Sequence, residues 1–383
     1  MNVCIRQFSA RCSLGDQLDA CVDNLLESVP APSSLSFAQL GEAISLPYFC
    51  APREDDFYRE LEITLDHLLQ SAGLDRKARQ NTALLIGSSS FDVHISEARY
   101  RADIAKRGAE TAVPMPIIGY GKLAERLAGS LSLGPVRYTY STACTSSANA
   151  LLYAGRLIRC GVVEHALVLG TEHRNTTSAL GFHGLGLVSP SGEMHPFDAN
   201  RDGLILGEGL GALLLSPDSL TPPHERRWQL AGGAIGTDNH SLTAAHVSGE
   251  EIASVIRAAL ADAGVAPGDI QAVKVHGTAS LKNDEAEASA LQAVFSEIPK
   301  AFALKPFIGH TLGACGALEA ALTLGALARG VLPANPRARS DGQLGVKLHT
   351  SAPAAGPGYY LFNCFAFGGN NNALVLRDLG AGE

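Results

Sequence analysis

Residues 138–153 read YTYSTACTSSANALLY, and this segment contains a predicted change from strand to helix. An apolar strand ends, Ser and Thr residues follow, and a helical stretch begins; Thr142, Thr145 and Ser146 are residue types that commonly start helices. Cys144 is therefore expected at or just before a helix N-terminus, where the helix dipole and free N–H groups stabilise a thiolate and lower the pKa of a thiol. The same N–H groups can hold an oxyanion when a thiolate attacks a thioester. Taken alone, the segment also fits a small cysteine packed between a strand and a helix.

Short apolar runs alternate with helical stretches along the rest of the chain. Strands are predicted at 83–87, 136–140, 166–170, 211–215, 270–275, 359–363 and 373–376, and helices at 55–72, 117–131, 146–159, 250–263, 284–295 and 317–329. Most of the strands are continuous apolar runs, which is typical of strands buried on both faces. The alternation predicts an α/β fold with layers of helices and mainly parallel sheets.

The best internal boundary is the segment 216–227, which reads SPDSLTPPHERR. Pro222 and Pro223 cannot continue a helix or a central strand. The boundary predicts two halves, 1–220 and 221–383, with similar numbers of strands and helices. No sequence repeat relates the halves, so periodicity does not reveal a duplication.

Charge and cysteine content exclude several classes of function. The chain of 383 residues has a net charge of −8, which disfavours nucleic acid and anionic membrane surfaces as partners. The eight cysteines form no C-x-x-C pair and no zinc-like cluster, so we expect no metal and a reducing, cytoplasmic location. Residues 1–15 contain no apolar core of a signal peptide. The apolar segment 311–332 contains Glu319 and Arg329 and predicts a buried helix rather than a membrane span.

Two of the twelve histidines stand in a context that suggests chemistry. His276 follows an apolar strand and precedes Gly277, and His310 precedes the start of a helix rich in Gly and Ala. A condensation needs a carbanion equivalent, such as the enolate that a malonyl thioester forms when it loses CO2. Two imidazole Nε donors could polarise that thioester and stabilise the enolate, and the charge of Lys305 could tune His310. Each histidine alone also fits a structural role.

Longer motifs accompany these residues in a fixed order. They are residues 142–146 (TACTS), 195–211 (HPFDANRDGLILGEGLG), 276–278 (HGT), Lys305 with 309–310 (GH), and 363–371 (NCFAFGGNN). This set resembles the Cys-His-His-Lys residues and flanking motifs of elongating β-ketoacyl-acyl-carrier-protein (ACP) synthases of the thiolase superfamily. The resemblance runs from about residue 117 to the C-terminus, while the first hundred residues match weakly.

The resemblance implies a thiolase-like fold of five layers, αβαβα, made of two similar halves. It also implies an acyltransferase, a β-ketoacyl-ACP synthase that condenses malonyl-ACP with an acyl group held on Cys144, with loss of CO2, in fatty-acid or polyketide synthesis. An aryl-polyene-type pathway is one expectation. The implied partners are an acyl carrier protein and a second subunit, either a copy of this chain or a related ketosynthase-like chain. No bound cofactor is implied, because the acyl groups travel on the 4'-phosphopantetheine arm of ACP.

By the same resemblance, further residues have expected roles. Backbone N–H groups of Cys144 and Phe367 would form the oxyanion hole, and Phe367 would act as a gate. Thr278 and Ser280 would contact the phosphopantetheine arm. Glu287 and Glu319 would be structural acids.

The chain departs from the family pattern at several positions. Ser280 replaces the second Thr of the H-G-T-x-T motif, Ala366 replaces the Gly before the gate, and Asn370 replaces a Thr. Residues 52–60, where relatives carry a basic docking patch, are acidic, so docking of ACP would fall to other basic residues. The candidates are Arg99, Arg101, Lys106 and Arg107.

Two other functions remain open at this stage. A non-catalytic partner subunit like a chain-length factor usually lacks the nucleophile, which this chain has. A thiolase resembles a Cys-His-Cys pattern, and Cys364 near the C-terminus keeps that option open. The sequence gives neither the acyl chain length, the starter, nor the choice between homodimer and heterodimer.

Overall fold

The structure is a computed structural model, and it describes residues 1–39, 42–52, 56–111, 120–338 and 344–380. The strands and helices of the N-terminal part are β1 (Val3–Cys12), α1 (Leu18–Glu27), β2 (Ser33–Gln39), β3 (Glu42–Phe49), α2 (Phe57–Ser71), α3 (Arg76–Gln80), β4 (Thr82–Gly87), α4 (Val93–Arg107), α5 (Gly121–Ser130), β5 (Arg137–Tyr140), α6 (Ser146–Arg159), β6 (His165–Glu172), α7 (Thr176–Gly184), β7 (Leu206–Gly207) and β8 (Gly209–Pro217). The C-terminal part contains β9 (Trp228–Thr237), α8 (Glu250–Ala263), β10 (Ile270–Lys274), α9 (Leu281–Val294), β11 (Lys300–Phe302), α10 (Lys305–Ile308), α11 (Cys315–Ala328), β12 (Gly358–Phe365) and β13 (Asn370–Asp378).

Over the described residues, ten strands form one sheet in the order β11-β10-β12-β13-β9-β1-β8-β6-β4-β5. A short pairing of β1 with β9, Cys4 opposite Gln229 and Ile5 opposite Trp228, joins its two halves. Both halves have the same strand order. Numbered along the chain within each half, the five strands lie side by side as 3-2-4-5-1, which is β5-β4-β6-β8-β1 in the first half and β11-β10-β12-β13-β9 in the second. The halves therefore share one topology that no sequence repeat reveals. We propose that they divide near residue 220.

The expectation of mainly parallel sheets is wrong. The two neighbours of β4 in the first half, and of β10 in the second, run parallel to it. The other strand pairs of the two halves are antiparallel: β6 with β8, β1 with β8, β12 with β13, and β13 with β9. A strand covered on both faces is a continuous apolar run whichever way its neighbour points, so the apolar runs predicted burial and not direction. Strands β12 and β13 are linked by a short turn, which only an antiparallel pair allows.

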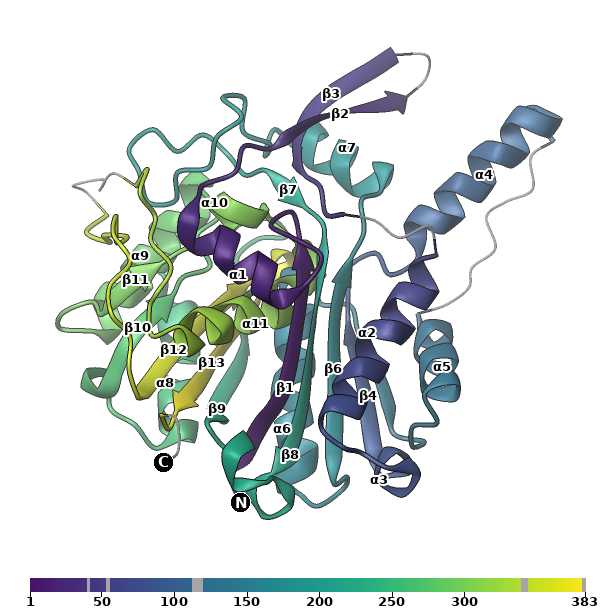
Figure 1. Cartoon of the computed structure of the whole chain (residues 1–383). Helices are drawn as coiled ribbons and strands as arrows, with labels where there is room; N and C mark the ends of the chain where they lie inside the picture. The colour runs from purple at the N-terminus through teal and green to yellow at the C-terminus, as the bar shows by residue number, and fades with distance from the viewer. Residues whose placement is uncertain (40–41, 53–55, 112–119, 339–343, 381–383) are drawn as a thin grey trace.

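Helices cover the sheet in layers (Figure 1). Helices α6 and α11 lie between the two halves and pack against strands of both. Helices α2 and α5 cover the outer face of the first half, and α8 packs on β9 and β13 with α9 beside it on the second half. The expected order of five layers is thus confirmed.

The two central helices approach each other closely because Gly316 lies where they meet. A methyl group at Gly316 would come within 2.2 Å of the Ala148 nitrogen. Helix α11 is buried over almost its whole length, which confirms the buried helix predicted within 311–332. In the described part of the chain, no helix is both long enough and apolar enough to cross a bilayer.

Candidate active site

Cys144 lies in a one-turn 3-10 helix, Ala143–Thr145, that leads directly into α6. Ala143 has a φ of 49°, a left-handed conformation that is costly for a residue with a side chain and often marks functional turns. Ser146 holds the turn, because its Oγ accepts from the Thr142 N–H at 2.9 Å and donates to the Ala143 carbonyl at 2.6 Å. The Cys144 sulfur thus stands at the N-terminus of a buried helix, as the sequence predicts.

The expected lowering of the Cys144 pKa is wrong for the resting site. Burial raises the pKa of this thiol to about 12, although the charge of Lys305 and a hydrogen bond from the Phe367 backbone N–H act in the opposite direction. Only 5% of the residue is exposed, so the loss of hydration of a thiolate exceeds the local stabilisation. The thiol is therefore neutral at rest and loses its proton as it reacts.

His276 follows β10, and Glu287 of α9 fixes its backbone. The two carboxylate oxygens of Glu287 accept from the N–H groups of His276 at 2.8 Å and Gly277 at 2.9 Å. The Asn363 side chain donates to the same carboxylate at 3.0 Å. The predicted structural acid is thus buried directly behind the predicted catalytic histidine.

Hydrogen bonds at Nδ1 set the tautomer of both histidines. The Leu312 backbone N–H donates to Nδ1 of His310 at 3.3 Å, and the Lys305 ammonium lies 3.4 Å from Nδ1 of His276. A backbone N–H and an ammonium can only donate, so each Nδ1 is an acceptor and each ring carries its proton on Nε2. The ring centroids are 5.4 Å apart at 84°. The two rings thus supply a pair of N–H donors close together.

Both imidazoles are neutral at physiological pH. Burial, with the charge of Lys305 second, lowers the pKa of His310 to about 3 and that of His276 well below its usual value. A neutral imidazole donates through Nε2–H without carrying a full charge, which suits a group that holds a carbonyl oxygen as it becomes an enolate.

Glu319 of α11 lies between two buried lysines. The Lys305 ammonium is 2.8 Å from one carboxylate oxygen and the Lys274 ammonium is 2.5 Å from the other. Burial favours a neutral acid, but the two ammonium charges outweigh it and lower the pKa of Glu319 to about 2. Lys305 also donates to the His276 carbonyl at 2.7 Å, so this charged cluster connects directly to the histidine.

Cys144, His276 and His310 line one cavity of about 310 Å³. Its walls include the side chains with predicted roles in catalysis and in binding the arm, namely Cys144, His276, His310, Phe367, Thr278 and Ser280. The hydroxyls of Thr278 and Ser280 lie 3.0 Å apart on one wall. Lys305, Glu287 and Glu319 do not line the cavity but lie behind the histidines. The structure therefore brings together residues that the sequence separates by more than 200 positions.

The predicted gate, Phe367, stacks on Phe182 of α7 with ring centroids 5.6 Å apart and planes 11° apart. Ala366 has a φ of −137°, an extended conformation open to any residue, so replacing the family's glycine causes no strain in this state. The left-handed residues of the turn are Gly368 and Gly369.

Lys274, Phe182 and Glu172 also belong to the site, although the sequence predicts no role for them. Glu172 is buried at the end of β6 and accepts from the N–H groups of Ser89 at 2.8 Å and Gly313 at 3.0 Å. It thereby ties the turn after His310 to the first half of the sheet. Lys274 and Glu172 are charged residues at the ends of apolar strands, and this sequence signal could have identified them. No sequence signal points to Phe182.

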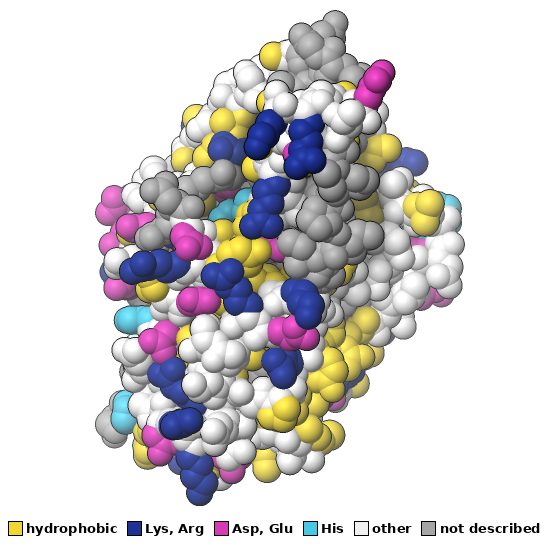
Figure 2. Space-filling view, turned by 90° about the vertical axis from the view of Figure 1, so that its right-hand side faces the viewer, with side chains coloured by type: hydrophobic (Ala, Val, Ile, Leu, Met, Phe, Trp, Pro, Cys, Tyr) yellow, Lys and Arg dark blue, Asp and Glu magenta, His cyan; other side chains and the backbone are white. Residues whose placement is uncertain are grey.

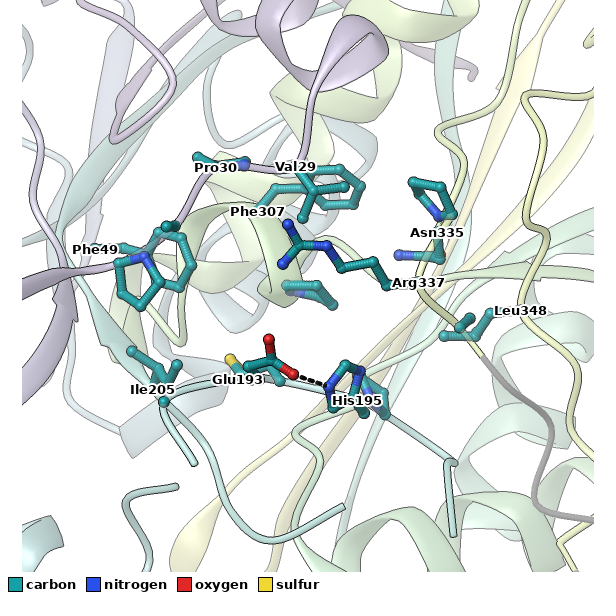
Figure 3. Close-up of a pocket in the computed structure, with 18 residues that line it drawn as sticks. Val29, Pro30, Phe49, Glu193, His195, Ile205, Phe307, Asn335, Arg337 and Leu348 are labelled. Carbon is teal, nitrogen blue, oxygen red and sulfur yellow. Dashed lines mark hydrogen bonds and ion pairs between the residues drawn. The ribbon is translucent and has the colours of Figure 1, made fainter. Parts of the chain in front are cut away.

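A second cavity, of about 90 Å³, is lined in part by Pro306 and Phe307 of α10 (Figure 3). Val29, Phe49, Ile205 and Phe307 provide apolar walls, and Figure 3 shows the Arg337 side chain reaching toward them above the Glu193–His195 pair. None of the predicted catalytic residues lines it. Among the described residues, no cluster of three His, Cys, Asp or Glu side chains has the geometry of a metal site.

The fold and the cavity define a thiolase-like acyltransferase. A family model described as the beta-ketoacyl synthase N-terminal domain matches residues 50–220, and the corresponding C-terminal domain matches residues 229–338. The chain belongs to the β-ketoacyl synthase family.

Curated and solved relatives agree with this assignment. A 3-oxoacyl-[acyl-carrier-protein] synthase 2 of Mycobacterium tuberculosis is 32% identical over 299 residues, which cover 72% of this chain and 69% of the relative. The Vibrio cholerae enzyme of the same name is 28% identical over 81% of this chain and 79% of its own. Among solved structures, a chain from the complex of a ketosynthase with its chain length factor from Xenorhabdus doucetiae is 25% identical and superimposes with a TM-score of 0.85 over 98% of both chains.

Proposed function

We propose that this chain condenses malonyl-ACP with an acyl group that Cys144 carries, and that it releases CO2 in the process. The convergence of one buried thiol and two Nε2–H donors in a single cavity is the observation that carries the proposal.

In the first step the Cys144 sulfur attacks the thioester carbonyl of an acyl-ACP. The carbon–sulfur bond to the phosphopantetheine arm breaks, and the thiol proton passes to the leaving sulfur. Backbone N–H groups of Cys144 and Phe367 hold the oxyanion, and the contact of the Phe367 N–H with the sulfur supports this role.

In the second step malonyl-ACP binds with its arm along Thr278 and Ser280. His276 and His310 donate from Nε2 to the thioester oxygen while the bond to the carboxylate breaks and CO2 leaves. The bond electrons form an enolate, whose carbon attacks the acyl group on Cys144. The Cys144 thiolate is then expelled, a 3-oxoacyl-ACP departs, and the thiolate takes up one proton from solvent to restore the neutral thiol.

The partners are an acyl carrier protein and a second ketosynthase-like subunit. The four basic residues of α4, Arg99, Arg101, Lys106 and Arg107, are exposed and form the candidate docking surface. Similarity to a chain of a ketosynthase–chain length factor complex supports a heterodimer, and a homodimer is the alternative. A non-catalytic, chain-length-factor-like role is disfavoured, because Cys144, His276, His310 and Lys305 are all present. A cytoplasmic location and a fatty-acid, polyketide or aryl-polyene-type pathway remain predictions.

Two substitutions of Cys144 test the proposal. Cys144→Ala should form no acyl-enzyme on incubation with acyl-ACPs, as measured by intact-mass spectrometry, while Cys160→Ala should be acylated normally because Cys160 is exposed at the end of α6. Cys144→Gln should still release CO2 from malonyl-ACP, and adding His276→Ala or His310→Ala should stop it. Acylation of the Cys144→Ala chain, or CO2 release that needs neither histidine, would refute the assigned roles.

A further inference from the structure

Cys315, the first residue of α11, is a buried thiol beside the predicted catalytic histidine. Its sulfur lies 3.2 Å from Nδ1 of His310 and does not line the cavity. The Thr311 hydroxyl donates to the same sulfur at 3.6 Å. The thiol is therefore a neighbour of the histidine and not a group that substrate could reach.

The direction of the hydrogen bond between Cys315 and His310 follows from the other bond at Nδ1. The Leu312 N–H can only donate, so Nδ1 carries a lone pair and no proton. The Cys315 S–H must then be the donor in this contact. Burial raises the pKa of the Cys315 thiol well above its usual value, which keeps that proton in place.

The two histidines are secured by different kinds of donor. Nδ1 of His276 faces the Lys305 ammonium at 3.4 Å, whereas Nδ1 of His310 receives a long backbone bond and the thiol. If the ring of His310 moved its proton to Nδ1, Nε2 would present a lone pair to the cavity. A lone pair repels the carbonyl oxygen that the proposed reaction needs to hold.

We propose that the Cys315 thiol is a positioning residue that donates to His310 Nδ1 and keeps the Nε2–H of this ring directed into the cavity. The proposal rests on the proposed condensation. It assigns no contact between Cys315 and substrate.

Kinetics in the Cys144→Gln background isolates the step that depends on the histidines. Cys315→Ala should slow CO2 release from malonyl-ACP by about five- to tenfold, the effect of one lost hydrogen bond. Loss of a donor also makes Nδ1 easier to protonate, so the acid limb of the pH profile should move to higher pH. The charged groups around the ring, Lys305, Glu319 and Lys274, are unchanged in this variant. Cys315→Ser should restore both the rate and the limb, and Cys160→Ala should change neither.

A second measurement needs no turnover. ¹⁵N spectra of histidine-labelled protein report the tautomer, and the signal of His310 is identified by its absence in His310→Asn. The parent chain and Cys315→Ser should show an unprotonated Nδ1, while Cys315→Ala should show a mixture of tautomers. If Cys315→Ala does not fold, Cys315→Val replaces it in both measurements. A Cys315→Ser chain that behaves like Cys315→Ala, or equal slowing at every pH with no change of tautomer, would overturn the positioning role. Failure of the Cys144→Gln chain to release CO2 would instead count against the proposed function, and the tautomer would still decide the role of Cys315.

Discussion

At the scale of single residues, the charge of the site is concentrated in Glu319 and its two lysines. All three side chains are at most 1% exposed, and the cluster carries one more positive than negative charge. Lys274 also donates to the Asn363 carbonyl at 2.6 Å, so the surplus ammonium is hydrogen-bonded to β12. Removing the shared carboxylate would leave two buried cations without a counter-charge.

Glu319→Gln should therefore lower the free energy of unfolding by about 3–5 kcal/mol, the usual effect of breaking a buried ion pair from one side. Lys274→Met should lower it by less, because it leaves one lysine paired with one glutamate. Urea unfolding at pH 7 measures both. Equal stability of Glu319→Gln and the parent chain would show that Glu319 is not the charged partner of the lysines.

The buried histidines predict a dependence of stability on pH. The folded pKa of His310 is about 3 and the pKa of His276 is also lowered, whereas an unfolded histidine titrates near 6.5. Below pH 6.5 the unfolded chain binds protons that the folded chain does not, so stability falls as the pH decreases, by about 1.4 kcal/mol per pH unit for each such proton.

His310→Gln should reduce the dependence of the free energy of unfolding on pH by about 1.4 kcal/mol per pH unit between pH 6 and pH 4, because one histidine no longer takes up a proton on unfolding. Urea unfolding across that range measures it. Comparing the slopes of the two chains cancels the contributions of Glu172 and Glu287. Burial raises the pKa of both carboxyls, so they act in the opposite direction. Parallel slopes for the two chains would contradict a neutral, buried His310.

At the scale of elements, the sequence locates two helices to the residue. The predicted helices 146–159 and 250–263 have the bounds of α6 and α8 in the structure. Strand β1 was missed because Arg6 and Arg11 interrupt its apolar run. Arg6 pairs with Glu225 at 2.6 Å and Arg11 with Glu60 at 2.8 Å, partners more than 45 residues away that a local pattern cannot reveal.

The contact between α6 and α11 gives a prediction at this scale. Gly316→Ala should destabilise the protein by about 2 kcal/mol or more, because its methyl group would overlap the Ala148 backbone and force the helices apart. Gly129→Ala in α5 is the matched control, since a methyl group there meets open space. It should be neutral or raise stability by up to about 1 kcal/mol through helix propensity. Thermal unfolding separates the two, and equal melting temperatures would argue against a close crossing.

At the scale of the whole molecule, an acidic chain must still receive an acidic carrier protein if the proposed function holds. Figure 2 views the side of the molecule on which α4 lies and shows Lys and Arg side chains gathered there. Arg107 is 2.7 Å from Asp103, and Arg101 is 3.8 Å from Glu97, so acids of the same helix partly neutralise these two. Within the described ranges no ion pair is recorded for Arg99 or Lys106, and these two are the better candidates for docking.

The double variant Arg99→Glu and Lys106→Glu should raise the KM for malonyl-ACP by about tenfold or more, because each reversal places like charges together. Turnover of a small malonyl-pantetheine thioester should not change, and the defect should shrink at high salt, which screens exposed charges. Lys77→Glu on α3 reverses an exposed charge away from α4 and serves as the control. An unchanged KM would move the docking surface elsewhere.

The two halves of the molecule also share a local motif. Thr142 and Ser146 precede and begin α6, while Thr311 and Cys315 occupy the same places before α11. Ala143 and Leu312, at equivalent positions, both have a positive φ. One copy of this turn carries the nucleophile and the other follows His310, so the shared topology explains how both reach one cavity.

The local sequence alone was enough to place Cys144 before a helix and His276 after a strand, because turns, helix starts and buried strands depend on neighbours within a few residues. The pairing of the two halves, the burial of Lys274 with Lys305 around Glu319, and the sign of the Cys144 pKa shift came only from the tertiary structure. All three depend on burial. Apolar surfaces and ionisable side chains lose their contact with water only when residues hundreds of positions apart pack together in the folded chain.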